Sequence, residues 1–198
     1  RSQIEVGTTI CTHLSEAYDQ LSALRKTISE VAGEYGLAPI SASTHPMARW
    51  KDQLHTPKAR YATLVGELQG VARRMVICGM HVHVGVEDPD LRIDLMNQVK
   101  YFLPHILSFS TSSPLWAGVD TGLKSYRLTI FDNLPRTGLP EAFSGYHDYL
   151  EYTETLKASG LVEDTSKLWW DVRPSSKFPT LEMRISDACT RLDDSMAV

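Results

Sequence analysis

Two histidines placed two residues apart are the clearest chemical signal in this sequence. His81 and His83 lie in residues 76–86, where apolar side chains alternate with other residues without interruption. Alternate residues of a β-strand point to the same face, roughly 6.7 Å apart, so the two imidazoles could bind one metal ion or one anion. Hydrogen-bonded histidines in an ordinary sheet are the simpler interpretation of an isolated pair.

Charged residues follow the same pattern in two other segments. Residues 180–186 set Glu182 and Arg184 opposite apolar side chains, and residues 3–10 do the same for Glu5. A sheet built from these segments, with helices on its apolar face, would collect the two histidines and the three charged residues on its other face. Glycines beside the histidines would let a ligand approach the backbone closely. We therefore predict a functional site on this face.

Several helices and loops must position these strands. Four segments carry apolar residues at the helical spacing and predict helices: 14–31, 57–75 after Thr56-Pro57, 89–102 after Asp88-Pro89, and a stretch within 141–158. Pro104 is expected to break or kink the third helical path. Residues 108–122 and 133–140 are rich in Ser, Pro and Gly and predict loops. Residues 124–131 alternate more weakly and predict a further strand, with Arg127 on its polar face.

Other chemistries fit the residues less well. The spacing His81-x-His83-x-x-x-Glu87 matches a cupin metal motif, but cupins are β-barrels and lack the strong helices predicted here. The glycines that flank the cupin motif are replaced by Met75 and Asp94. An amidohydrolase, which also uses a His-x-His pair, would need a barrel of about 250 residues. The sequence contains no G-x-S-x-G, P-loop or G-x-G-x-x-G motif, so nucleophile-based chemistry has little support.

Composition and charge exclude several classes of protein. The 198 residues are 42% hydrophobic and 22% charged, with a net charge of -4, which is typical of a folded domain and not of a disordered tail. The sequence lacks both a basic stripe and a run of roughly 20 apolar residues, so we expect neither nucleic acid nor a membrane as partner. Three cysteines far apart in apolar surroundings suggest reduced thiols and a cytoplasmic location.

The segments that carry these residues form an ordered set. In chain order they are SQIEV (2–6), THP (44–46), CGMHVHVG (78–85), PH (104–105), STSSP (110–114), DTG (120–122), LPRTGLP (134–140), WWDVRP (169–174) and TLEMR (180–184). The CGMHVHVG segment resembles the central strand of the type 2 glutamate–cysteine ligases, carboxylate–amine ligases of the gamma-glutamylcysteine synthetase superfamily. The other segments follow in that family's order, and the resemblance covers essentially the whole chain.

The resemblance implies a fold and a reaction. The fold would be α+β, with an antiparallel curved sheet and helices packed on one face, similar to the catalytic part of glutamine synthetase. Residues 1–198 would be a single catalytic domain. The reaction would be an ATP-dependent amide bond formation between the γ-carboxylate of glutamate and an amino acid such as cysteine, through an acyl phosphate, as in glutathione biosynthesis. The partners would be these small molecules and ATP with Mg²⁺ or Mn²⁺, and a homo-oligomer is compatible with the family.

The resemblance also implies roles for the residues on the polar face. Glu5, His81 and Glu182 would be ligands of the Mg²⁺ or Mn²⁺ ions that hold ATP. Arg184 would contact ATP and the transferred phosphate. His83 and Arg127 would be further catalytic candidates near the substrate.

Thr44 and His45 would lie at the edge of the cleft and contribute to cofactor binding, with Ser43 where the family often has glycine. Two alternatives stay open: a metal-dependent hydrolase or oxygenase that uses the His-x-His pair, and a non-catalytic relative that binds a nucleotide or an amino acid. The chain opens inside a strand pattern without a start methionine and closes on a helix-start pattern at residues 193–198. We therefore expect further chain on both sides: the resemblance implies a preceding strand that carries acidic metal ligands and a C-terminal helical part after Val198.

Overall fold

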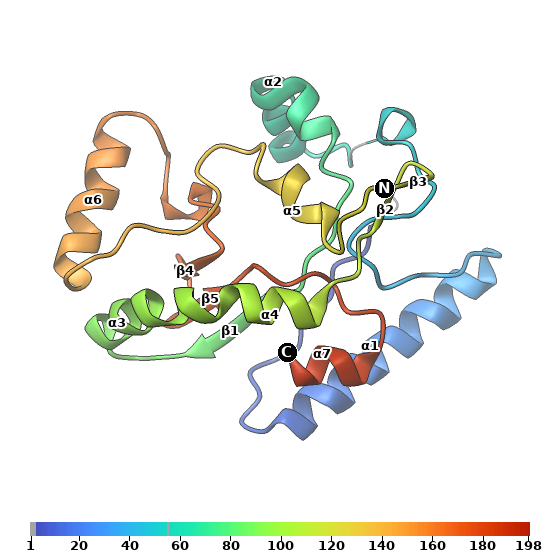
Figure 1. Ribbon diagram of the computed structural model, residues 1–198, viewed down its shortest axis with the longest axis horizontal. Coiled ribbons are helices and arrows are strands. Elements are labelled where there is room, and N and C mark those ends of the chain that lie inside the picture. Colours follow the sequence, from blue (N-terminus) through green and yellow to red (C-terminus); the bar gives the residue numbers. More distant parts are fainter. Residues whose placement is uncertain (1–2, 55) are drawn as a thin grey trace.

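In its described residues, the chain folds into helices arranged around two small antiparallel sheets, an α+β architecture (Figure 1). The computed structural model describes residues 3–54 and 56–198, without the side chains of residues 60, 64 and 67. The helices are α1 (Leu14–Glu34), α2 (Ala59–Arg73), α3 (Pro89–Val99), α4 (Leu103–Ser110), α5 (Tyr126–Phe131), α6 (Tyr146–Ala158) and α7 (Leu192–Ala197). The strands are β1 (Val82–Gly85), β2 (Leu115–Trp116), β3 (Val119–Asp120), β4 (Val172–Pro174) and β5 (Thr180–Met183). Short 3₁₀ turns cover Trp50–Asp52, Lys100–Phe102 and Thr165–Lys167.

The predicted helices are confirmed by α1, α2, α3 and α6. Helix α2 begins at Ala59 after the cap residue Lys58, so the predicted start at Thr56-Pro57 is wrong, and the non-helical backbone of Gln69 interrupts it. Helix α3 begins where the sequence indicates, because the Asp88 carboxylate accepts the backbone N–H groups of Asp90 and Leu91 at 2.9 and 3.0 Å. Pro89 follows in the first turn, where a missing N–H removes no helical hydrogen bond. The helical path after α3 passes through a 3₁₀ turn, and Pro104 lies in the first turn of α4.

The sheet that carries the candidate site has the strand order β1-β5-β4, and both pairs are antiparallel. Its register sets His83 beside Glu182, and Glu182 beside Arg173. The strand predicted over residues 180–186 is confirmed over its first four residues by β5, and Figure 1 shows β5 between the two other strands. The histidine pair and Glu182 therefore share one face of a real sheet.

The strand predicted over residues 76–86 is confirmed only for β1, and the reason is a change of register. The pairing of Val82 with Met183 would set Gly79 opposite Ser186 if the ladder continued. Gly79 instead bridges to Asp187, so the chain beyond β5 has one extra residue at this point. Residues before Val82 consequently contact other segments through isolated bridges.

The apolar face of this sheet packs against α3 and joins the main core. Val172 is 0% exposed and Leu181 4% exposed, and Trp170 is buried beside them. The other core residues are Ile93, Met96, Leu103, Phe143, Tyr149, Val162, Leu168 and Ile185. Helices thus cover one sheet face as predicted, although Val84 at the edge of β1 remains 45% exposed.

Residues 124–131 do not form the predicted strand. They contain α5, whose buried residues Arg127, Ile130 and Phe131 are spaced by three and four positions, the spacing of one helix face. A segment this short shows both periodicities, and burial of one face against the rest of the molecule selects the helix.

Residues 3–10 also differ from the prediction, because they form no strand in the part of the chain that the structure describes. Ile4 and Ile10 are 65% and 97% exposed, so the alternation has no core to face. Gln3 links the segment to the residues before β1, because its side-chain amide donates to the carbonyl of Ile77 at 2.7 Å.

The loops are confirmed in part. Residues 133–140 are irregular as predicted. Residues 108–122 hold the end of α4 and a hairpin of β2 and β3, joined by Ala117 and Gly118 with φ angles of 51° and 86°. Two positive φ angles give the turn that suits a two-residue hairpin loop. Among the described residues, every helix is too short or too polar to cross a lipid bilayer.

Candidate active site

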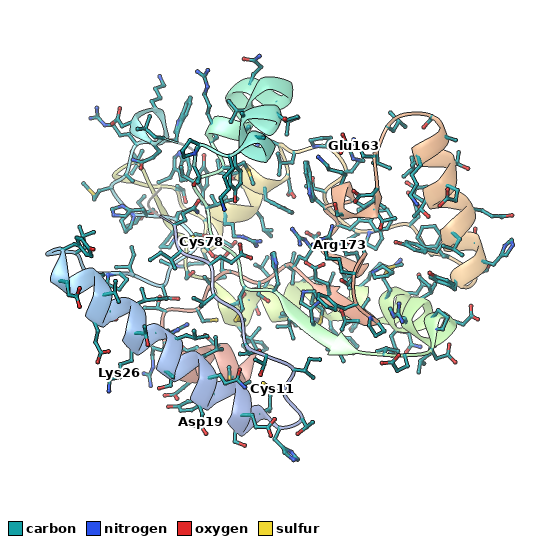
Figure 2. The ribbon with its side chains drawn as sticks, turned by 180° about the vertical axis from the view of Figure 1, so that it is seen from behind. Cys11, Asp19, Lys26, Cys78, Glu163 and Arg173 are labelled. Atoms are coloured by element: carbon teal, nitrogen blue, oxygen red, sulfur yellow. The ribbon has the colours of Figure 1, made fainter. Side chains whose placement is uncertain are left out.

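Three strands bring four of the predicted site residues together on the polar face of the sheet. His83, Glu182 and Arg173 form one cross-strand row. His81, just before β1, and Arg184, just after β5, extend the same face by one row, because alternate residues share a face. The sequence analysis missed Arg173, although it lies in the WWDVRP segment (Figure 2).

Glu182 is the centre of this cluster. Its side chain is 5% exposed, and its Oε2 accepts a hydrogen bond from Arg173 Nε at 2.8 Å. Arg184 Nη1 donates to Oε1. Burial alone would raise the pKa of Glu182, but the hydrogen bond from Arg173 and the charges of both guanidinium groups outweigh it and hold the pKa at about 2. Glu182 is therefore an ionised carboxylate at neutral pH.

The two histidines face the same carboxylate oxygen. His81 Nδ1 lies 3.6 Å and His83 Nε2 4.0 Å from Glu182 Oε1. Burial, together with the positive charge of Arg184, lowers the pKa of His81 to about 3 despite the opposing effect of Glu182. His83 Nδ1 forms a hydrogen bond with Thr180 Oγ1 at 2.9 Å. His81 is consequently neutral at pH 7, the state in which an imidazole binds a metal ion.

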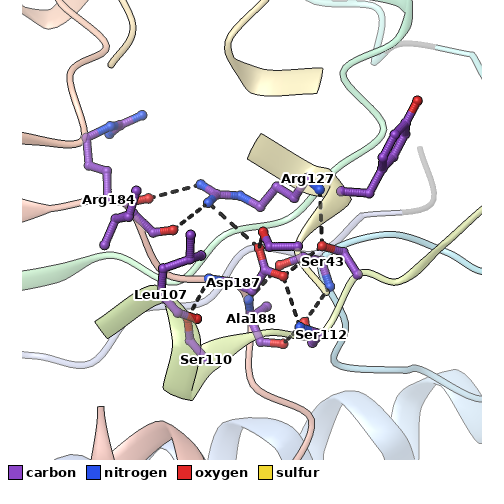
Figure 3. Close-up of polar contacts among 12 residues, drawn as sticks. Ser43, Leu107, Ser110, Ser112, Arg127, Arg184, Asp187 and Ala188 are labelled. Atoms are coloured by element: carbon purple, nitrogen blue, oxygen red, sulfur yellow. Dashed lines mark hydrogen bonds and ion pairs between the residues drawn. The ribbon is translucent and has the colours of Figure 1, made fainter. Parts of the chain in front are cut away.

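Arg127 approaches the same sheet from α5, and its guanidinium group binds backbone carbonyls. Its side chain is 3% exposed; Nη1 donates to the carbonyl of Ile185 at 3.1 Å and Nη2 to that of Arg184 at 3.0 Å (Figure 3). Its guanidinium carbon lies 5.4 Å from the centre of the Phe131 ring. The structure therefore places Arg127 under the end of β5, where it fixes the backbone that carries Arg184.

A buried aspartate, which the sequence analysis also missed, holds this region together. Asp187 is 0% exposed and lies 4.0 Å from Arg127. Its Oδ2 accepts from the Ser112 backbone at 2.9 Å and from Ser113 Oγ at 2.7 Å, while Oδ1 accepts from Ser125 Oγ at 2.9 Å (Figure 3). The serine-rich STSSP segment was the signal in the sequence that could have pointed to Asp187, because a buried carboxylate needs several hydrogen-bond donors and serines provide them.

Asp171, which the sequence analysis also missed, directly precedes β4 and extends the polar face of the sheet by one row. Arg184 N donates to the Asp171 carbonyl at 2.7 Å, so the two residues are cross-strand neighbours. Burial and the nearby carboxylate of Asp132 raise the pKa of Asp171 to about 6, against the opposing charges of Arg127 and Arg184. Within the described structure, Asp171 Oδ1 and Arg184 Nε are buried without hydrogen-bond partners.

The remaining predicted site residues lie away from Glu182's hydrogen-bonded cluster. Thr44 is buried and donates to the Leu115 carbonyl at 2.8 Å, which fixes the hairpin. His45 Nδ1 accepts from the backbones of Met47 and Ala48 at 3.1 and 3.0 Å and so closes an exposed turn. Both contacts are structural, and a cofactor role for either residue stays a prediction.

Glu5 is exposed and lies outside any helix or strand. Among the side chains that the structure describes, no three His, Cys, Asp or Glu residues form a group that could hold a metal ion. The structure brings His81 and Glu182 together but does not complete the set with Glu5. The metal role of these three residues stays a prediction.

Comparisons with known proteins match the whole chain, including the segments that carry this cluster, to one family. The sequence profile of glutamate-cysteine ligase family 2 matches residues 1–198. Proteins named "Putative glutamate–cysteine ligase 2" from Rhodospirillum rubrum, Ruegeria pomeroyi and Jannaschia sp. are 61%, 57% and 54% identical over 198, 196 and 196 residues. These matches cover 100%, 99% and 99% of this chain, but only 51%, 51% and 52% of the relatives. The chain spans about half the length of these relatives, and it belongs to glutamate-cysteine ligase family 2.

Proposed function

We propose that this chain contributes to an ATP-dependent ligase that joins the γ-carboxylate of glutamate to the amino group of an amino acid such as cysteine. The observation that carries the proposal is the cluster of His81, Glu182, Arg173 and Arg184 on one sheet face, in segments that match the family. The proposal includes a sheet arranged like that of glutamine synthetase.

The reaction needs charge neutralisation more than it needs a protein nucleophile. Amide formation from a carboxylate is uphill in water, so ATP first transfers its γ-phosphoryl group to the γ-carboxylate oxygen and leaves as ADP. The uncharged amine then attacks the acyl carbon. The bond from that carbon to the phosphate oxygen breaks, and inorganic phosphate and the proton of the amine are released. Transfer of a phosphoryl group depends on positioning and on neutralising the phosphate oxygens.

Arg184 suits a phosphate contact. Only Nη1 of its guanidinium group is hydrogen-bonded to Glu182, and its side chain is 11% exposed at the polar face. A planar guanidinium group can offer two parallel donors to phosphate. Arg173, in contrast, donates to Glu182 and to the carbonyls of Ser166 and Leu168, so its role is to hold Glu182.

His81 and Glu182 suit a share in cation binding. Mg²⁺ commonly takes one or two protein ligands and completes its shell with water and phosphate oxygens, so a full set of protein donors is not required. The neutral imidazole of His81 favours Mn²⁺ modestly over Mg²⁺. When bound, the cation would neutralise charge on the phosphate oxygens. Glu182 would have to exchange its bond to Arg184 for such a contact.

The full-length protein provides the test. We expect ADP production to require glutamate and an acceptor amino acid together, and to fall by at least about 10²-fold in Arg184→Gln. The control is Arg191→Gln, because Arg191 is exposed and pairs only with Asp193 among the described residues. ADP production without an amino-acid requirement would refute the proposal. Zn²⁺ or Fe²⁺ retained after dialysis would instead favour the hydrolase or oxygenase built on the histidine pair.

A further inference from the structure

Asp171 is a buried carboxyl group whose hydrogen bonds do not account for its burial. Its residue exposure is 7%, and Oδ1 has no hydrogen-bond partner in the part of the chain that the structure describes. A buried polar atom without a partner costs roughly 1–3 kcal/mol, so folded proteins rarely leave one without a reason. The position therefore calls for a functional explanation.

The neighbour that could satisfy this carboxyl group is Arg184. The backbone hydrogen bond from Arg184 N to the Asp171 carbonyl, 2.7 Å long, makes the two residues cross-strand neighbours with both side chains on the polar face. Directly opposed residues have Cβ atoms about 4.5–5.5 Å apart. Arg184 Nε is also buried without a partner among the described residues. An unsatisfied donor and an unsatisfied acceptor thus belong to neighbouring side chains.

Two other charged groups act on Asp171. Arg127 attracts the carboxylate too, and its Nε is also buried without a partner among the described residues. Its two Nη atoms bind the carbonyls of Ile185 and Arg184, however, and so fix its guanidinium group under β5. Asp132, at the end of α5, repels the carboxylate of Asp171. The Arg184 guanidinium carbon also lies 6.0 Å from the centre of the Phe131 ring, which restricts where that group can move. Arg184 therefore has two carboxylate neighbours on the polar face: Glu182, to which it is hydrogen-bonded, and Asp171, opposite it on the next strand.

We propose that Asp171 is a positioning residue, the second carboxylate partner that holds the guanidinium group of Arg184 in place over the sheet. Glu182 is the first partner. When a ligand binds Glu182 and displaces Arg184 from it, Asp171 remains as the carboxylate partner of Arg184. Asp171 itself touches no substrate. The inference rests on the proposed function only where it takes Arg184 as the contact to a nucleotide phosphate.

The consequence is a pH dependence, since ionised Asp171 attracts the guanidinium group more strongly than the neutral carboxyl group does. Burial and Asp132 raise the pKa of Asp171 to about 6, while Arg127 and Arg184 oppose them. Asp171 is therefore ionised at pH 7.5 and mostly protonated at pH 5. Arg184 would be held firmly at the higher pH and loosely at the lower one.

The first test needs no ligand. The pKa of Asp171 is measured by ¹³C NMR of the labelled carboxyl group in the full-length protein, in the wild type and in Arg184→Gln and Arg184→Lys. We expect the pKa to rise by about 1 in Arg184→Gln, to rise less in Arg184→Lys, and to stay unchanged in the control Arg191→Gln. An unchanged pKa in both Arg184 variants would overturn the proposal.

The second test measures the affinity for Mg–ATP between pH 5 and pH 8. The ratio of wild-type to Asp171→Asn affinity cancels the ionisation of the nucleotide itself. We expect this ratio to be about tenfold at pH 7.5 and to approach one at pH 5. In Asp132→Asn the transition remains but moves to lower pH, because one repelling charge is gone.

A ratio that is constant with pH, with a change in melting temperature alone, would make Asp171 merely structural. If the wild type binds no Mg–ATP while Arg184 still shifts the pKa of Asp171, the pairing stands and the proposed ligase function fails. The two tests therefore separate the failure of the inference from the failure of the proposed function.

Discussion

Glu182 combines a candidate role in the reaction with a role in stability. Its carboxylate binds Arg173 and Arg184, whose side chains are 12% and 11% exposed, so neither guanidinium group can turn fully to water. An isolated site residue can be replaced without loss of folding, but a carboxylate between two buried cations cannot. Loss of activity in a Glu182 variant is informative only when its folding is measured as well.

We expect Glu182→Gln to lower the free energy of unfolding by about 3–5 kcal/mol at pH 7, since it leaves two buried charges without their partner. The lowered pKa of Glu182, about 2 against an ordinary 4.5, adds a pH signature. The stabilisation by the ionised carboxylate is present above pH 4.5 and is lost as the pH falls towards 2, so the difference from wild type should shrink over that range. Urea unfolding at several pH values measures both effects.

The control is Glu163→Gln, because Glu163 is 78% exposed and pairs with Lys167 at 3.7 Å on the surface. Its effect should stay within about 0.5 kcal/mol. Equal stability of Glu182→Gln and wild type would show that the buried ion cluster does not form in solution.

At the scale of elements, the approach of α5 to the segment before β1 depends on one glycine. A Cβ added at Gly79 would lie 2.8 Å from Arg127 Cζ, closer than real Cβ atoms come. Arg127 cannot move aside freely, because it binds the carbonyls of Arg184 and Ile185 and faces Asp187. The glycine beside the histidines therefore admits a guanidinium group of the protein itself, rather than the ligand expected from the sequence.

We expect Gly79→Ala to lower the free energy of unfolding by about 1–3 kcal/mol through overpacking against Arg127. Gly85→Ala is the matched control, because Gly85 lies on the same face of the strand region and nothing described lies within 4 Å of its added Cβ. Thermal or urea unfolding of both variants provides the comparison. A larger loss from Gly85→Ala than from Gly79→Ala would contradict the placement of Arg127.

The same elements show what the sequence could predict. Helix α3 was predictable, because Asp88 and Pro89 are local start signals and the apolar spacing continues for three turns. The shared polar face of His83 and Glu182 was predictable, because alternation assigns each side chain to the face opposite the apolar one, although their pairing in one row depends on the register of β1 and β5. These features depend on residues close together in the sequence or on a period of two.

Features that depend on contacts between residues far apart in the chain were not predictable from the hydrophobic pattern of the sequence. Helix α5 was mistaken for a strand, because six residues carry both periodicities and only burial of Arg127 and Phe131 decides between them. Residues 3–10 alternate, but a strand also needs a partner to pair with, and alternation does not supply one. The partnership of Arg173 with Glu182 follows from the register of β4 and β5, which no local signal specifies.

Across the whole molecule, the elements differ in how firmly they are packed against the main core. The main core gathers residues from α3, α4, α6 and the central sheet, whereas none of the residues of α1, all of them described, is buried. Figure 1 shows α1 at one side of the molecule with α7 beside it, and the apolar Leu14 and Val31 of α1 are 73% and 50% exposed. A helix with little apolar burial depends on specific polar contacts for its position.

Arg25 provides those contacts. Its Nη1 donates to the Thr190 carbonyl at 3.0 Å, and its Nη2 donates to the Cys189 carbonyl at 3.0 Å and to Ser195 Oγ at 3.1 Å. Charge-assisted hydrogen bonds to three points around α7 tie the middle of α1 to the segment that follows the candidate site. Among the residues that the structure describes, Lys26, the next residue, instead pairs only with Glu30, at 3.8 Å on the exposed side (Figure 2).

We expect Arg25→Gln to speed amide hydrogen exchange throughout α1 by roughly tenfold, which corresponds to about 1.4 kcal/mol of lost local stability. Exchange in α3 and α6 should stay unchanged, because the core that holds them contains no residue of α1. Lys26→Gln removes a neighbouring positive charge of the same helix and should leave the exchange of α1 within twofold of wild type, since exposed pairs contribute little. Faster exchange in the core helices of Arg25→Gln would mean that α1 is part of one cooperative unit with the sheet, and an unchanged α1 would mean that its apolar residues, rather than Arg25, hold it in place.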